Sequence, residues 1–155
     1  MNDLQSHSEE FTLTSKVFAN NEIMPALYTC DGRDINPPLK INNTPKGTKS
    51  LALIMDDPDA PPGVWDHWIK WNIPADTTFI EEGKEPQGVC GIGTSGNTDY
   101  HGPCPPSGTH HYVFKLYALD LVVNLIKKSS KKELEEAMVG HILGETSLTG
   151  LYKRQ

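Results

Sequence analysis

Several stretches of the chain alternate apolar and polar side chains with the period of a β-strand. The two clearest lie at 65–73 and 110–120, where every second residue belongs to one face of an extended chain. The run 50–55 is almost continuously apolar, which is typical of a central strand buried on both faces. The pattern therefore predicts a mainly β fold. Shorter strands are predicted at 11–18, 23–28 and 147–152.

One helix is predicted, beginning near Ser130. Ser130 and Glu133 fit a capping box, in which the two side chains satisfy free backbone N–H groups. Gly144 suits a C-terminal cap. No other segment has an equally clear helical period, so we expect few and short helices. The helical stripe consists of Leu134, Ala137, Met138 and Ile142.

In three predicted strands the core-facing side chains change from apolar to ionisable at one end. Asp57 continues the face of Leu51, Leu53 and Met55. His67 shares a face with Ile69 and Trp71. If these strand ends meet, they form a pocket with apolar walls and a polar floor, the usual shape of a ligand site. The ionisable residues at the three ends are Asp57, His67, His110 and Tyr112.

Each of these segments also has a purely structural interpretation. A single histidine on an apolar strand face is more often a hydrogen-bonded core residue than a ligand. The segment 57–61 has the composition of a turn, because Asp and Pro both favour turns. The prolines at 103–106 fit a stiff connection equally well. Only the coincidence of three such segments favours a binding site.

Composition limits the class of protein. With 155 residues the chain can bury a full-sized core as one domain, expected at 11–155. Twenty acidic and 14 basic residues give a net charge of −6, which disfavours nucleic acids and anionic membrane surfaces. No apolar run is long enough for a stable membrane insertion, and residues 1–10 lack the features of a signal peptide. We expect 1–10 to form a polar, flexible leader.

The three cysteines, Cys30, Cys90 and Cys104, are widely spaced and include no C-x-x-C motif. An odd number at such spacings argues against a disulfide framework and against a zinc ribbon. We therefore expect reduced thiols and a cytoplasmic location.

Three short motifs, in this order, resemble the phosphatidylethanolamine-binding protein family, which includes the Raf kinase inhibitor proteins and prokaryotic relatives. The first is Asp-Pro-Asp-Ala-Pro at 57–61, and the second is His67 between two tryptophans. The third is Gly-x-x-Pro-Pro-x-Gly-Thr-His-x-Tyr at 102–112. The similarity covers about 11–155, and the short C-terminus resembles the prokaryotic branch.

The resemblance implies a β-sandwich-like fold of two sheets with a small anion-binding pocket at one end. The ligand would be phosphate, a phosphorylated headgroup or a carboxylate. The resemblance is compatible with a kinase or serine protease as a protein partner and with a homodimer, without deciding either. It implies no cofactor, metal ligand or catalytic residue. The ligand-binding residues would be Asp57, Asp59, His67, Gly102, Pro105, Pro106, His110 and Tyr112.

The sequence departs from the family pattern near the third motif. His111 stands where the family usually has arginine, and it is expected on the strand face opposite His110, so the change concerns a supporting ion pair. Cys104 replaces a glycine of the animal members, and its side chain either narrows the pocket or faces away. Outside the motif, Ile41 replaces a tryptophan of many bacterial relatives, a change expected to affect only packing.

The expected pocket places two aspartates beside a bound anion, although groups of like charge repel each other. One aspartate can orient a histidine and favour its protonated form, so that His67 and His110 offer N–H donors to the oxyanion. The Tyr112 hydroxyl and loop N–H groups would complete the set of donors. The second aspartate could accept a hydrogen bond from a protonated phosphate or receive an ammonium group.

Two other classes of function are weighed against binding. The histidines and aspartates could hold a divalent metal ion for a metal-assisted hydrolase, but the H-x-H and H-E-x-x-H spacings are absent. A nucleophilic pair of Cys104 with a histidine is disfavoured by the neighbouring prolines. Alternatively, a surface loop such as 81–96 would act on a protein partner, although polar loops of this kind are usually solvated connections.

Overall fold

The computed structural model describes residues 10–155, so the predicted leader lies outside the described residues except for Glu10. In this part of the chain, nine strands form two sheets, and one α-helix, α1 (Lys131–Met138), accompanies them. The prediction of a mainly β protein with two sheets is confirmed. A six-stranded sheet has the order β2-β9-β8-β4-β5-β7, and a three-stranded sheet has the order β1-β3-β6. The strands are β1 (Thr12–Thr14), β2 (Glu22–Ile23), β3 (Leu39–Asn42), β4 (Ser50–Asp57), β5 (Trp65–Pro74), β6 (Phe79–Ile80), β7 (Val89–Cys90), β8 (His110–Leu119) and β9 (Ile142–Tyr152).

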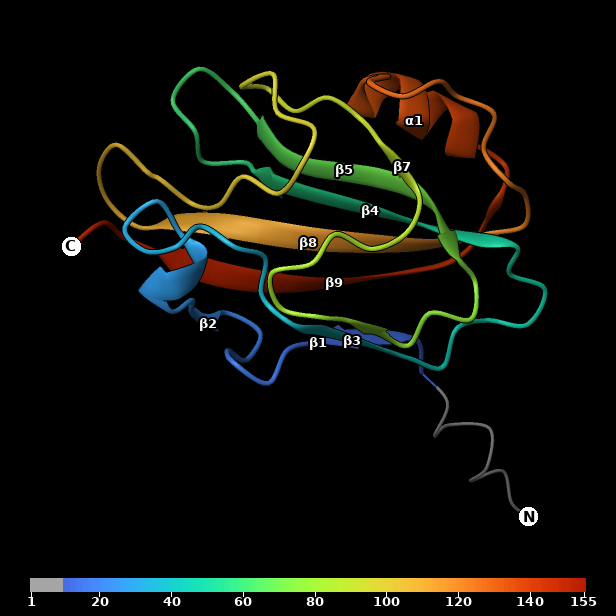
Figure 1. Cartoon of the computed structure of the whole chain (residues 1–155), viewed down its shortest axis with the longest axis horizontal. Coiled ribbons are helices and arrows are strands. Elements are labelled where there is room, and N and C mark those ends of the chain that lie inside the picture. Colours follow the sequence, from blue (N-terminus) through green and yellow to red (C-terminus); the bar gives the residue numbers. More distant parts are fainter. Residues whose placement is uncertain (1–9) are drawn as a thin grey trace, which may run out of the picture.

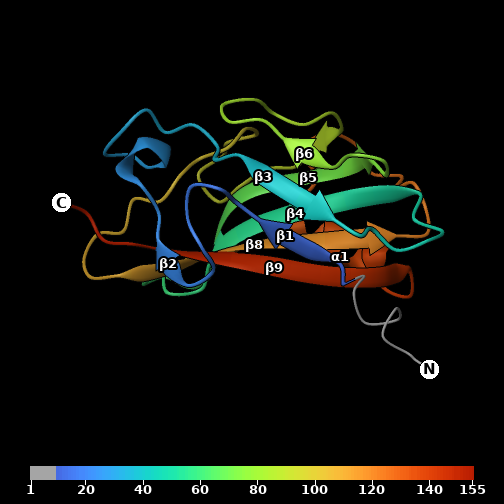
Figure 2. The same ribbon diagram turned by 90° about the horizontal axis from the view of Figure 1, so that it is seen from below.

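The large sheet forms the middle layer of the molecule. Figures 1 and 2 show the three-stranded sheet against one of its faces and α1 against the other. One buried cluster joins the two sheets and includes Leu39, Met55 and Phe114. A second cluster lies under the helix and includes Ile54, Trp71 and Leu134. Strand β4 is buried along its whole length because both of its faces are covered, as its apolar run predicts.

The helix begins as predicted and ends earlier. Ser130 is the N-cap, and its side chain and that of Glu133 form the reciprocal bonds of a capping box. The helix stops at Met138, and Gly140 follows with φ +83°, a conformation that ends the helical path. The prediction that the helix continues through Ile142 to a cap at Gly144 is wrong, because both residues belong to β9.

Two of the short predicted strands are shorter than expected. The segment 11–18 contains only β1, and 23–28 contains the end of β2 followed by a 3₁₀ turn, Ala26–Tyr28. Pro25 precedes that turn and has no N–H to donate to a ladder. The last strand is longer than predicted, since it begins at Ile142.

Two irregularities in β5 change the predicted faces of this strand. In the pairing of β4 with β5, the register shifts between Leu51↔Ile73 and Leu53↔Lys70. It shifts a second time between Met55↔Trp68 and Asp56↔Asp66. At each shift β5 has one residue more than β4. Ile69 and Trp71 therefore pack in the cluster under the helix, whereas Trp68 packs between the sheets. His67 is the extra residue at the second step and contacts Tyr112. The prediction that His67 shares a face with Ile69 and Trp71 is wrong.

The cysteines also depart from the prediction. Cys30 and Cys104 form a disulfide across 74 positions of sequence, and Cys90 is free. The expectation of reduced thiols is therefore wrong for two of the three, because sequence spacing does not show which loops the fold brings together. Within residues 10–155, no helix is long and apolar enough to cross a membrane.

Candidate functional site

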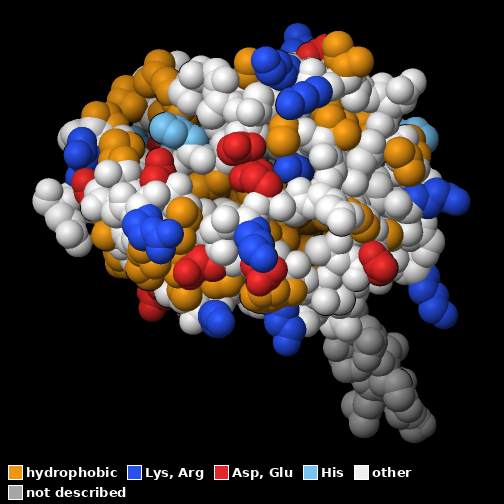
Figure 3. Space-filling view, in the orientation of Figure 1, with side chains coloured by type: hydrophobic (Ala, Val, Ile, Leu, Met, Phe, Trp, Pro, Cys, Tyr) orange, Lys and Arg blue, Asp and Glu red, His pale blue; other side chains and the backbone are white. Residues whose placement is uncertain are grey.

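A cavity of about 260 Å³ lies where β4 ends and where β5 and β8 begin. These ends meet because β4 pairs antiparallel with both neighbours. Figure 3 shows hydrophobic side chains beside a histidine side chain at the surface of this end of the molecule. The cavity is lined by Asp57, Ala60, Pro61, Pro62, Trp65, His67, His101, Cys104, Pro105, Pro106, His110 and Tyr112.

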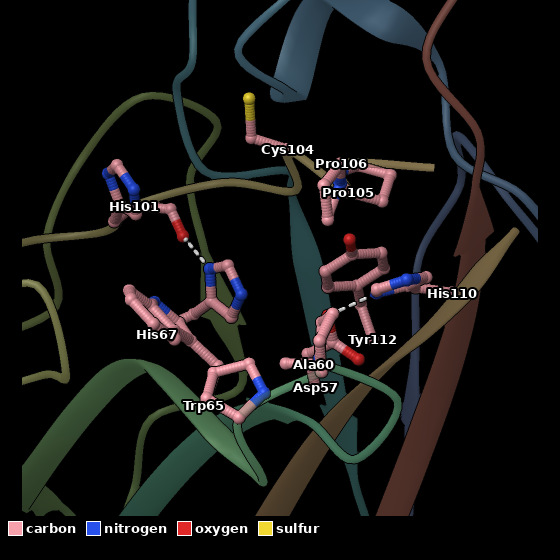
Figure 4. Close-up of a pocket in the computed structure, with 12 residues that line it drawn as sticks. Asp57, Ala60, Trp65, His67, His101, Cys104, Pro105, Pro106, His110 and Tyr112 are labelled. Carbon is pink, nitrogen blue, oxygen red and sulfur yellow. Dashed lines mark hydrogen bonds and ion pairs between the residues drawn. The ribbon is translucent and has the colours of Figure 1, made fainter. Parts of the chain in front are cut away.

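Asp57 and His110 form a buried pair at one side of the cavity. The His110 Nδ1 atom lies 2.7 Å from Asp57 Oδ2, and the two residues are 6% and 4% exposed (Figure 4). Since a carboxylate only accepts, Nδ1 carries the hydrogen, and Nε2 is the ring nitrogen left for a ligand. The other carboxylate oxygen of Asp57 accepts a hydrogen bond from the backbone N–H of Asp59 at 2.8 Å. Both Asp57 oxygens are therefore engaged.

His67 is held on the other side by the backbone. Its Nδ1 lies 2.6 Å from the carbonyl oxygen of His101 and donates to it. Burial lowers the pKa of His67, and the His101 hydrogen bond opposes this only in part. His67 is therefore mainly neutral near pH 7, and its Nε2 presents a lone pair. In this state it accepts a hydrogen bond rather than donating one to an oxyanion.

The Tyr112 hydroxyl lies between the two histidines. Tyr112 is fully buried. Its ring is nearly perpendicular to that of His67, with centroids 5.4 Å apart, and stacks with that of His110, with centroids 6.3 Å apart. Burial, followed by the negative charge of Asp57, raises the pKa of Tyr112 far above its ordinary value, so the hydroxyl stays protonated. Its oxygen lies near the Asp57 carboxylate and the Cys104 backbone but makes no hydrogen bond of good geometry with any described residue. A buried hydroxyl in this state is a free donor at the cavity.

The segment 101–106 forms the wall of the cavity. The Gly102 N–H donates to Asp34 Oδ1 at 2.8 Å. A β-carbon at this position would lie 2.3 Å from the carbonyl oxygen of Tyr28, so only glycine fits here without a shift. Gly102 thereby positions the wall but does not line the cavity. Figure 4 shows the Cys104 sulfur directed away from the cavity, which answers the question that the sequence left open.

The structure brings six of the eight predicted site residues to the cavity and leaves out two, Gly102 and Asp59. Asp59 instead binds His111, accepting from its Nδ1 at 2.7 Å and its backbone N–H at 2.8 Å. These hydrogen bonds lower the pKa of Asp59. His111 is exposed whereas His110 is buried, as expected for opposite faces of a strand. Asp59 thus supports the turn after β4 from outside the cavity.

Sequence reasoning missed six lining residues. His101 has the largest consequence, because its carbonyl fixes the proton of His67. Its position directly before Gly102, at the start of the third motif, was a usable signal. Trp65, directly before Asp66 and His67 in the second motif, also lines the cavity. The missed residues are Ala60, Pro61, Pro62, Trp65, His101 and Cys104.

Among residues 10–155, the group whose side chains could converge on a metal ion is Glu85, Cys90 and Asp99, outside the cavity. The Lys70 ammonium lies 3.3 Å from both Glu85 Oε1 and Cys90 Sγ. A positive charge is therefore already present at that group. The histidines and aspartate of the cavity do not form a comparable set of ligands.

Comparison with known proteins gives a consistent result. The family model described as phosphatidylethanolamine-binding protein matches residues 14–153. A UPF0098 protein of Methanothermobacter thermautotrophicus is 51% identical over 148 residues, covering 92% of this chain and 98% of that protein. A UPF0098 protein of Pyrococcus horikoshii is 52% identical, covering 91% of this chain and 76% of that protein.

Two solved structures share the fold. The phosphatidylethanolamine-binding protein homolog CT736 of Chlamydia trachomatis superimposes with a TM-score of 0.93 and 39% identity, covering 96% of this chain and 100% of that one. YbcL of E. coli, a member of the same family, gives a TM-score of 0.87 and 31% identity over 94% of this chain and 99% of that one. The chain belongs to the phosphatidylethanolamine-binding protein family.

Proposed function

We propose that the protein binds a small phosphate- or carboxylate-bearing anion, including a phosphorylated headgroup, in the cavity between His67 and His110. The observation that carries the proposal is the buried Tyr112 hydroxyl, which has no hydrogen-bond partner within residues 10–155. Leaving such a group unsatisfied costs about 1–3 kcal/mol, a cost that an acceptor oxygen in the cavity removes. Together with His110 Nε2, the hydroxyl supplies two donor positions when the imidazole is protonated.

The charges of the cavity favour an oxyanion that arrives with a proton. The Asp57 carboxylate lines the cavity, so a fully ionised ligand would meet a group of like charge there. A hydrogen phosphate can instead donate its own proton to the lone pair on His67 Nε2. Asp59 lies outside the cavity, so an ammonium group beside it is not part of the proposal.

The direct test is isothermal titration with phosphate of the parent protein and Tyr112→Phe. Loss of the hydroxyl is expected to weaken binding about tenfold, the effect of one well-placed hydrogen bond. Tyr117→Phe is the matched control, because Tyr117 lies on β8 but packs against the cluster under the helix. Equal phosphate affinity in the parent and Tyr112→Phe would contradict the proposal.

The other functions considered from the sequence receive less support. The metal-assisted hydrolase lacks converging ligands in the described cavity, and Cys104 is engaged in a disulfide. A kinase or protease partner stays a prediction of the sequence. A cytoplasmic location also stays a prediction of the sequence. Reduced thiols no longer support it, because Cys30 and Cys104 form a disulfide.

A further inference from the structure

The cavity wall is attached to the loop after the 3₁₀ turn by both covalent and hydrogen bonds. The disulfide joins Cys104 of the wall to Cys30 of the loop. One residue earlier in the wall, the carbonyl of Pro103 accepts a hydrogen bond from the Cys30 N–H at 3.0 Å. Asp34, further along the same loop, accepts from the Gly102 N–H. The position of the wall therefore depends on this loop.

The wall carries the groups that complete the cavity. At its start, the His101 carbonyl determines which nitrogen of His67 bears the hydrogen. At its end, Pro105 and Pro106 cover the space above the Tyr112 hydroxyl (Figure 4). A displacement of the wall would therefore change both the histidine and the volume offered to a ligand.

We infer that the Cys30–Cys104 disulfide is a redox-sensitive brace of the cavity: the closed bond holds the wall in its binding position, and opening it lowers the affinity for an oxyanion. This inference rests on the proposed function. Cys104 is exposed and Cys30 is half-buried, so a small reductant reaches the bond without unfolding of the core.

The reaction is thiol–disulfide exchange with a dithiol. A dithiol thiolate attacks Sγ of Cys104, the sulfur–sulfur bond breaks, and the electron pair leaves on Cys30 Sγ, which takes up a proton. The second thiol of the reductant then displaces Cys104 as a thiolate, which is also protonated. The dithiol is oxidised to a cyclic disulfide, and the two cysteines are reduced.

After reduction, hydrogen bonds such as those from Cys30 N and Gly102 N are left to hold the wall to the loop, so the change is expected to be a local opening of this contact. Such segments open independently of the core when few contacts hold them. Strands β4 and β8, buried between two layers, are not expected to respond.

The first experiment needs no ligand. Hydrogen–deuterium exchange of the full chain is followed before and after treatment with dithiothreitol. The hydrogen-bonded amides of Cys30 and Gly102, which join the loop to the wall, are expected to exchange at least about fivefold faster after reduction, while β4 stays unchanged. The double variant Cys30→Ser/Cys104→Ser should show the exchange rates of the reduced parent, and dithiothreitol should not change them. Cys90→Ser, which keeps the disulfide, should respond like the parent. Unchanged exchange at these two amides would overturn the inference.

The second experiment is phosphate titration of the oxidised and reduced protein. Reduction is expected to weaken binding about tenfold, and reoxidation is expected to restore it. Equal affinities in the two states would overturn the inference while leaving the proposed function intact. If the oxidised protein binds no phosphate, the proposed function fails; faster wall exchange still supports the brace, and unchanged exchange contradicts it.

Discussion

The Nδ1 atom of His67 donates to the backbone carbonyl of His101, at 2.6 Å, and this bond fixes the tautomer of a histidine inside the cavity. The two residues are 34 positions apart and come from β5 and from the wall segment. Because a carbonyl cannot donate, the remaining nitrogen of neutral His67 is an acceptor. Whether His67 gains a second proton therefore controls which ligands it binds.

Anion affinity is expected to rise as the pH falls. Burial lowers the pKa of His67, so the free protein holds this residue neutral near pH 7, and a bound anion favours the protonated form. Sulfate is the suitable probe because it does not titrate between pH 5 and 8. We expect tighter sulfate binding at pH 5.5 than at pH 7.5. His67→Gln should bind with a smaller pH dependence, and an identical dependence in both proteins would contradict this role.

The same pKa shift predicts an effect on stability without ligand. The unfolded chain protonates His67 at its ordinary pKa of 6.5, above the folded value, so the unfolded state binds more protons in this interval. The free energy of unfolding should therefore fall as the pH is lowered through 6.5 towards the folded pKa. Thermal unfolding between pH 7.5 and 5.5 measures the slope, and His67→Gln should reduce it.

Tyr112→Phe should have opposite effects on stability and binding. Removing a buried hydroxyl that has no hydrogen-bond partner in the described part of the chain is expected to raise the free energy of unfolding of the free protein by about 1 kcal/mol. The same change removes a donor for the anion. Urea unfolding monitored by circular dichroism checks the first effect. A loss of stability would show that the hydroxyl has a partner in solution.

The two aspartates of the first motif should differ in their contribution to stability. Asp57→Ala leaves His110 buried without its partner and is expected to cost about 3 kcal/mol. Asp59→Ala breaks a pair whose side chains are about half exposed and should cost less than about 1 kcal/mol. Chemical unfolding of both variants gives the comparison. Similar costs for the two changes would contradict the assigned environments.

Gly102→Ala tests the position of the wall. The added carbon would lie 2.3 Å from the Tyr28 carbonyl oxygen, so we expect a loss of about 1–3 kcal/mol and weaker anion binding. Gly140→Ala is the control, because its β-carbon meets no atom within 4 Å and only its positive φ is unfavourable. A tolerated Gly102→Ala would show that the wall moves freely.

The parts of the fold predicted from sequence are those determined by local pattern. The alternation in β8 placed Tyr112 and Phe114 on the core face correctly, because no irregularity interrupts that strand before its last residues. The capping box at Ser130 was identified because its partners are three residues apart. For the site, the family motifs placed Asp57, His67 and His110 at one cavity.

The errors come from features that depend on the rest of the structure. Asn72, with φ +57°, and the extra residue at His67 reverse the faces of β5, and neither has a distinct local signal. The turn after β4 directs Asp59 to His111, although it is only two residues from Asp57. The pairing of Cys30 with Cys104 depends on contact between two loops, which the spacing of the cysteines does not reveal.

The position of Trp65 gives the protein a built-in optical reporter. Of its three tryptophans, Trp68 and Trp71 are fully buried, and only Trp65 is half-buried and lines the cavity. Fluorescence quenching by iodide should therefore affect one indole selectively, and a ligand that fills the cavity should protect that indole. Occupancy of the cavity can then be followed without a label, in the intact chain and in either redox state.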